Sequence, residues 1–255
     1  MNVQKETLYL ETLNREAQLY VGLPNTYDPN TAYPVLFMHD GQNLFFEEDA
    51  AYGVTWGVKE AFEKDALPEC LVVGLSCAHG FDRLDEYGPF PFTFEGFNAP
   101  RPLGGKGDLY VEVIVKTILP LIEERYNVKK GPENTAIMGS SMGGVISLYA
   151  AYKYPHIFGR VASVSGAFYV SFEAFLDIYR DADFTHLQTF YMDTGDQEVG
   201  GGKPDQYMNT NEAIYQLIAP KLKTTKTQYR VVEGGIHHES AWASRFSDII
   251  TFLWS

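Results

Sequence analysis

The chain has 255 residues, 45% of them hydrophobic, which is enough to bury the core of one large α/β domain. Lys and Arg total 20 and Asp and Glu total 33, so the net charge is −13 at pH 7. Such an acidic surface argues against nucleic acid and anionic membranes as partners, and it disfavours polyanionic substrates.

The N-terminal residues and the cysteines predict a cytoplasmic protein. Residues 1–6 lack the basic stretch and apolar run of a signal peptide, and no apolar run approaches the ~20 residues that span a bilayer. Cys70 and Cys77 end one strand-like run, whose rise of ~3.3 Å per residue separates them by more than ~20 Å. A disulfide requires Cα atoms within ~7 Å, so we expect two free thiols.

Predicted strands and helices alternate along most of the chain. Two strand-like runs, 7–12 and 17–22, are joined by a hairpin turn at 13–16. Buried strands are predicted at 34–39, 70–76, 135–138, 160–166, 189–194 and 227–232, and helices at 54–65, 108–126, 143–154, 172–179, 205–219 and 240–254. Asp108 is the predicted N-cap of its helix, in which Pro120 should cause a kink or a break.

The segment 78–107 shows no clear period and is rich in glycine, proline and aromatic residues. Its aromatic residues are Phe81, Tyr87, Phe90, Phe92, Phe94 and Phe97. A loop of thirty residues is unusual inside a compact domain and is often functional. These rings either form a wall for a ring or sugar of the substrate, or only pack the loop against the protein.

The order of elements predicts an α/β fold, as a single domain over residues 1–255. We expect a mostly parallel central sheet with helices on both faces and an N-terminal antiparallel hairpin. Active sites on such sheets lie at the carboxyl ends of the strands. The candidate loops therefore follow His39, Ser76, Met138, Ser165, Thr194 and Val232.

The pentapeptide Gly139-Ser-Ser-Met-Gly143 lies between a predicted strand and a predicted helix. A G-x-S-x-G pattern in this context indicates a nucleophile elbow, whereas an isolated match is only a Gly-Ser turn. The turn is tight, so side chains two residues before and after the serine would clash. The N-terminus of the helix favours negative charge beside it. We predict that Ser141 is a nucleophile.

A serine hydroxyl needs a base to take its proton and a carboxylate to orient that base. In the chain order expected for this fold, the acid follows the serine and the histidine comes last. His237 follows the last predicted strand after a Gly-Gly turn, and we prefer it to His238 as the base. The four other histidines receive no role.

Three carboxylates are candidates for the acid: Asp193, Asp196 and Glu198. Asp193 lies within a predicted strand, where its side chain is available for structural contacts. Glu198 lies three residues past Gly195, where a loop can carry its carboxylate toward the histidine. We favour Glu198 and keep Asp196 as the alternative.

An oxyanion formed at the serine needs two preorganised N–H donors. We expect one from the backbone of Met142, directly after the serine, and one from Gln42 in the turn after residues 34–39, with Gly41 as the alternative. The sequence has no zinc spacing, C-x-x-C motif or phosphate-binding loop, so we expect no metal and no cofactor.

Four motifs together resemble the putative-esterase branch of the α/β-hydrolase superfamily, which includes the esterase D, enterochelin-esterase and feruloyl-esterase types. They are Gly139-Ser-Ser-Met-Gly-Gly144, His39-Asp-Gly-Gln-Asn-Leu-Phe45, Gly104-Gly-Lys-Gly-Asp108 with Leu119-Pro120 and Glu124-Arg-Tyr126, and Gly235-Ile-His-His-Glu239 with Trp242. The resemblance covers most of the chain, from about residue 34 to the end.

The resemblance implies a serine carboxylesterase with Ser141 as nucleophile, His237 as base and Gln42 as an oxyanion donor. It places the acid at Glu198, where the branch more commonly has Asp. The histidine after the base, His238, departs from the pattern of the branch.

We therefore expect hydrolysis of a small-molecule carboxylic ester, aryl or acylated-sugar, through an acyl-enzyme. An acyltransferase would use the same residues, and a catalytically silent binding protein would keep the same fold. The oligomeric state stays open, a homo-oligomer included.

Overall fold

The computed structural model describes residues 1–93, 99–223 and 225–255. These residues form an eight-stranded sheet in the order β1-β2-β4-β3-β5-β6-β7-β8. The strands are β1 (Asn2–Leu10), β2 (Arg15–Leu23), β3 (Val35–Met38), β4 (Leu71–Leu75), β5 (Thr135–Ser140), β6 (Arg160–Val164), β7 (Thr189–Gly195) and β8 (Lys226–Val232). β1, β2 and β4 pair antiparallel and all other pairs are parallel, so the predicted sheet with its N-terminal hairpin is confirmed.

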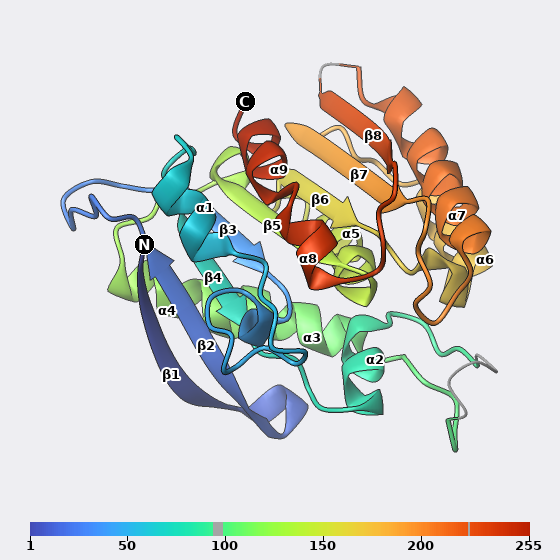
Figure 1. Ribbon diagram of the computed structural model, residues 1–255, viewed down its shortest axis with the longest axis horizontal. Coiled ribbons are helices and arrows are strands. Elements are labelled where there is room, and N and C mark those ends of the chain that lie inside the picture. Colours follow the sequence, from blue (N-terminus) through green and yellow to red (C-terminus); the bar gives the residue numbers. More distant parts are fainter. Residues whose placement is uncertain (94–98, 224) are drawn as a thin grey trace.

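Helices cover both faces of this sheet (Figure 1). On one face lie α2 (Phe81–Tyr87), α3 (Gly107–Val113), α4 (Leu119–Arg125), α5 (Met142–Lys153), α6 (Phe172–Arg180) and α7 (Pro204–Ile218). On the other face lie α1 (Val58–Lys64), α8 (Glu239–Ala243) and α9 (Phe246–Leu253). Within the described residues, no helix has the length and apolar character that crossing a bilayer requires.

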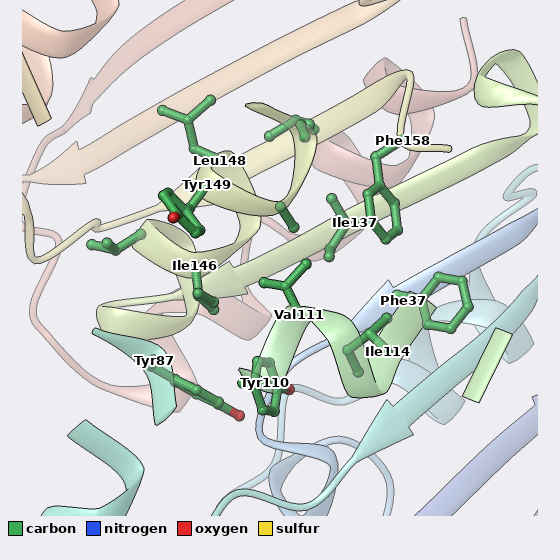
Figure 2. Close-up of a cluster of buried hydrophobic side chains, with 14 of the residues drawn as sticks. Phe37, Tyr87, Tyr110, Val111, Ile114, Ile137, Ile146, Leu148, Tyr149 and Phe158 are labelled. Atoms are coloured by element: carbon green, nitrogen blue, oxygen red, sulfur yellow. The ribbon is translucent and has the colours of Figure 1, made fainter. Parts of the chain in front are cut away.

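Alternation along the strands divides the core into two apolar layers. Phe37 of β3 and Ile137 of β5 point toward α3 and α5, where they pack with Val111 and Ile146 (Figure 2). The intervening residues, such as Leu36, pack on the opposite face with α1 and α9. Because both faces are covered, the parallel strands read as continuous apolar runs rather than alternating ones.

The predicted helix 108–126 is divided into three parts. A π-helical turn, Ile114–Ile118, separates α3 from α4. The three parts are continuous, and Pro120, which has no N–H to donate, lies two residues after the π-helical turn. The disturbance predicted at Pro120 is therefore a π-helical turn and no interruption of the helix, and the predicted N-cap is wrong. Lys106 holds that position, and Asp108 lies in the first turn, where it accepts a hydrogen bond from Tyr149 at 2.8 Å.

The expectation of an irregular loop over 78–107 is wrong, because this segment contains α2 and a β-bridge between Phe92 and Leu103. The buried Asp85 carboxylate stabilises the segment by accepting from Arg101 at 2.6 and 2.9 Å and from the N–H of Gly104 at 2.9 Å. These partners lie 16 to 19 residues further along the chain, so no local pattern could reveal them.

Most of the described aromatic rings of this segment pack it against the protein. Tyr87 is fully buried, Phe92 is nearly so, and Phe90 contacts Tyr149 and Phe175 edge-on. Phe81 is 37% exposed and is the described ring best placed to meet solvent or substrate. Phe94 and Phe97 lie outside the described residues.

The single helix expected over 240–254 is wrong, because the chain forms α8 and α9 with a break at Ser244 and Arg245. Arg245 is only 4% exposed and donates from Nε to Asp193 of β7 at 2.6 Å. The buried ion pair thus competes with the continuation of the helix, and it takes precedence over local helix propensity.

Gly144→Ala tests how closely α5 lies on β6. A Cβ at Gly144 would lie 2.8 Å from Ser163 Oγ and 3.1 Å from the backbone of Val164. We expect the free energy of unfolding to fall by about 1–3 kcal/mol, measured by urea denaturation. Ser147→Ala, one turn later, adds no atom and removes only the hydrogen bond from its hydroxyl to the Gly143 carbonyl, so it should lower the free energy of unfolding by about 1 kcal/mol or less. Equal stability of both variants would contradict this packing.

Candidate active site

Ser141 lies at the turn between β5 and α5 with a positive φ of 58° and a ψ of −124°. A Cβ on Gly139 would lie 2.9 Å from the carbonyl carbon and oxygen of Gly143, so the turn tolerates no side chain there. The strand and helix predicted around Ser141 are confirmed. A serine with positive φ is a strained conformation of the kind found at functional turns.

The loop after β3 lies beside this turn. A Cβ on Gly143 would lie 3.3 Å from Cβ of His39 and 3.5 Å from Oδ2 of Asp40. The backbone of Gly41 packs against β4, and a Cβ on Gly41 would be 2.7–2.8 Å from the backbone of Gly74 and Leu75. The structure therefore brings together the two segments that were predicted to supply the oxyanion donors.

Gln42 and Met142, the two predicted donors, lie at the starts of helical turns. Met142 begins α5, where backbone N–H groups have no intrahelical partner. Gln42 lies in the 3₁₀ turn Gly41–Asn43, and its side chain bonds to Cys77 in both directions. The N–H of Cys77 donates to Oε1 at 3.1 Å, and Nε2 donates to Sγ at 3.2 Å.

Asp40 holds the start of this loop in place. Its φ of 55° is left-handed, and its N–H donates to the Tyr87 hydroxyl at 3.0 Å. Both carboxylate oxygens accept from Arg83 at 2.7 Å. Burial alone would raise the pKa of Asp40, but the adjacent Arg83 guanidinium outweighs burial and holds that pKa below its usual range.

Glu198 and His237 are joined by a short hydrogen bond. The Nδ1–H of His237 donates to Oε2 of Glu198 at 2.5 Å, and Glu198 is fully buried. Their loops meet because Gly195 and Gly235 are in backbone contact, and a Cβ on Gly195 would overlap the Gly235 carbonyl. A carboxylate facing Nδ1 keeps the ring proton there and leaves Nε2 able to accept a proton.

Aromatic rings flank His237 on two sides. The ring centroid of Tyr207 lies 4.8 Å away, and that of Trp242 lies 5.0 Å away at a nearly perpendicular angle. These contacts restrict rotation of the imidazole without using its nitrogen atoms.

The alternative carboxylates have other partners. Asp193 is fully buried and forms a bidentate pair with Arg245, as its place within a strand suggested. Asp196 accepts from the N–H of Gly234 at 2.8 Å and so stabilises the turn after β8. His238 is the N-cap of α8, where Nδ1 accepts from the N–H of Ser240 at 3.2 Å.

Three residues of this site escaped the sequence analysis: Ser165, Trp242 as a hydrogen-bond donor, and Arg245. The hydroxyl of Ser165 lies between Glu198 and the two donors Trp242 and Arg245. The position of Ser165 at the end of a predicted strand was the one available signal. Arg245 gave none, because it lies within the predicted helix 240–254.

His39 is a buried structural histidine. Its Nδ1 lies 2.9 Å from the Tyr110 hydroxyl, and burial lowers the pKa of His39 to about 3. Among the described residues, no three His, Cys, Asp or Glu side chains lie close enough together to hold a metal ion.

Comparison with known proteins gives consistent matches. The sequence profile of the family described as "Putative esterase" matches residues 11–253. The uncharacterized protein YbbA of Bacillus subtilis (strain 168) is 28% identical over 252 residues, covering 94% of this chain and 93% of its own.

Two solved structures share the fold. The BES protein from Bacillus cereus superposes with a TM-score of 0.78 at 18% identity, covering 99% of this chain and 96% of its own. A ferulic acid esterase superposes with a TM-score of 0.73 at 20% identity, covering 99% and 97%. Both confirm the expected α/β-hydrolase-like fold.

Glu198→Gln tests which carboxylate serves His237. An amide nitrogen facing Nδ1 would force the wrong tautomer, so we expect kcat to fall by roughly 10³–10⁴. Asp196→Asn is the matched control, because its amide oxygen still accepts from Gly234 and kcat should change less than about threefold. The measurement is kcat on p-nitrophenyl acetate. A large loss in Asp196→Asn alone would move the acid to Asp196.

The depressed pKa of His39 predicts a loss of stability in acid. The folded protein keeps His39 neutral down to about pH 3, whereas the unfolded chain binds a proton below about 6.5. The contribution of neutral His39 to the free energy of unfolding is complete above pH ~6.5. Below that pH the free energy of unfolding falls by up to about 1.4 kcal/mol per pH unit. In urea denaturation from about pH 7 to 4, His39→Gln should therefore show a shallower fall than wild type. Parallel curves would contradict the assignment.

Proposed function

This chain belongs to the putative esterase family and is a carboxylesterase-type hydrolase, and we propose that it forms an acyl-enzyme on Ser141. The observation that carries the proposal is the 2.5 Å hydrogen bond from His237 to the buried Glu198. The bond lies at the carboxyl edge of the strands, where Ser141 also lies. The N–H of Ser141 donates to the carbonyl of Val164 at 2.9 Å, and the next residue, Ser165, contacts Glu198.

In the proposed reaction, Ser141 Oγ attacks the ester carbonyl while Nε2 of His237 takes its proton. Glu198 stabilises the resulting imidazolium through Nδ1. The N–H groups of Met142 and Gln42 bind the oxyanion of the tetrahedral intermediate. The intermediate collapses as His237 returns the proton to the leaving alcohol, and the acyl group stays on Ser141. Water then repeats the sequence and releases the acid.

Exposed apolar side chains beside these residues support an aryl ester as substrate. Val199 follows Glu198 and is 73% exposed, and Ile236 precedes His237 and is 45% exposed. Tyr52 is 74% exposed, and its ring lies 6.3 Å from that of His238. Apolar surface of this kind binds a ring or acyl chain better than a charged group. An acylated sugar is the second class of substrate in the proposal.

Labelling with a fluorophosphonate tests the activated serine. We expect the reagent to modify Ser141, located by peptide mass spectrometry, and modification to be absent in Ser141→Ala and strongly slowed in His237→Ala. Ser140→Ala, one residue earlier, is the matched control and should be labelled like wild type. In the same preparation, kcat/KM should be higher for p-nitrophenyl esters than for ethyl esters of the same acid.

An unlabelled wild type would contradict the proposal and favour a binding role for the fold. Labelling without release of acid, together with ester formation on an added alcohol, would indicate an acyltransferase.

A further inference from the structure

The hydroxyl of Ser165, directly after β6, has all its hydrogen-bonding capacity in use. The indole Nε1–H of Trp242 and an Nη2–H of Arg245 each donate to Ser165 Oγ at 3.0 Å. Neither partner can accept, and a serine oxygen has two lone pairs and one hydrogen. The two donors therefore occupy both lone pairs. The hydroxyl hydrogen is left to its third partner, Oε1 of Glu198, at 2.5 Å.

The Arg245 donor is itself held in one position. Its Nε and Nη2 donate to the two oxygens of Asp193 at 2.6 and 3.0 Å, and the Tyr191 hydroxyl donates to Asp193 at 2.8 Å. Asp193 is fully buried and Arg245 is 4% exposed. A planar guanidinium in a buried bidentate pair has little freedom to rotate, so its remaining Nη2–H stays directed at Ser165.

The consequence at Glu198 is a carboxylate that meets only donors. Oε1 accepts from Ser165 and from the N–H of Gly195 at 2.7 Å, and Oε2 accepts from His237. A proton on Oε1 would face two hydrogens and have no acceptor. Both oxygens thus serve as acceptors, and this arrangement keeps the His237 proton on Nδ1.

We propose that Ser165 is a positioning residue of the esterase reaction, which donates its hydroxyl hydrogen to Glu198 and so holds that carboxylate as an acceptor aligned with His237. The inference rests on the proposed function, since Glu198 and His237 serve catalysis only if Ser141 is the nucleophile. Ser165 is fully buried, and its effect passes through Glu198.

Ser165→Gly is the sharpest variant. Ser165 has a φ of 49°, a left-handed conformation that glycine adopts without strain, so this change removes the hydroxyl and relaxes the backbone. Ser163→Ala is the matched control. Ser163 lies two residues earlier, on β6, and is fully buried, and its hydroxyl has no hydrogen-bond partner among the described residues.

Two readouts are measured from about pH 5 to 9: the rate of fluorophosphonate labelling at Ser141, and kcat and KM for p-nitrophenyl acetate. In Ser165→Gly we expect kcat to fall about 10- to 100-fold with little change in KM, as for the loss of a hydrogen bond to a charged group. The acidic limb of the pH profile of kcat should move to higher pH. With one donor fewer, the carboxylate attracts the His237 proton more strongly and favours the protonated ring, which cannot act as a base. Ser163→Ala should stay within about twofold, with its limb unmoved.

Trp242→Phe gives a second test, because it frees one lone pair of Ser165 and keeps a ring beside His237. The limb should move in the same direction by a smaller amount. The inference would be overturned if the acidic limb stayed in place in both variants. It would also be overturned if the loss of rate in Ser165→Gly only followed the folded fraction of that variant in thermal unfolding. An unlabelled wild type would instead overturn the proposed function, so the two failures are distinguishable.

Discussion

Three neighbouring strands of the sheet, β3, β5 and β6, are each followed by a residue whose φ is positive. These residues are Asp40, Ser141 and Ser165, and none of them is glycine. Positive φ turns the chain sharply at the strand end. The N–H groups of Ser141 and Ser165 then donate to Val164 and Asp193 on the next strand, and that of Asp40 donates to Tyr87 of α2. The strain costs on the order of 1 kcal/mol per residue, and tertiary contacts must offset it. The candidate active site depends on this repeated constraint.

Buried ion pairs supply part of that compensation. α2 carries both Arg83, which binds the loop after β3 through Asp40, and Glu86, which accepts two hydrogen bonds from Arg15 of β2 at 2.7 Å. The N-terminal hairpin is thereby connected through one short helix to the loop after β3. On the other side, Arg245 and Asp193 connect the C-terminal helices to β7. Removing one partner would leave a buried charge, which is far more costly than the pair itself is stabilising.

The sequence was most informative where structure is local or periodic. Apolar runs located the parallel strands, and the strand-glycine-helix pattern located Ser141 together with its neighbouring segments. Glu198 was favoured on loop reach and on the family resemblance, and it lies against His237 in the structure. What escaped prediction depends on partners distant in the chain. Asp85 binds Arg101, and Arg245 turns inward to Asp193, a residue 52 positions away. Neither the periodicity of hydrophobic residues nor the residues that cap helices indicate such pairs.

The contact between Gln42 and Cys77 bears on how the protein responds to oxidants. Burial, with a further contribution from the Asp40 carboxylate, raises the pKa of Cys77 to about 12. At neutral pH the side chain is therefore a thiol, whereas the thiolate is the form that reacts with peroxides and alkylating agents. A sulfur atom thus takes part in fixing the loop after β3 without becoming a point of chemical damage. The same loop would be vulnerable if the thiol lay in an open, electropositive setting.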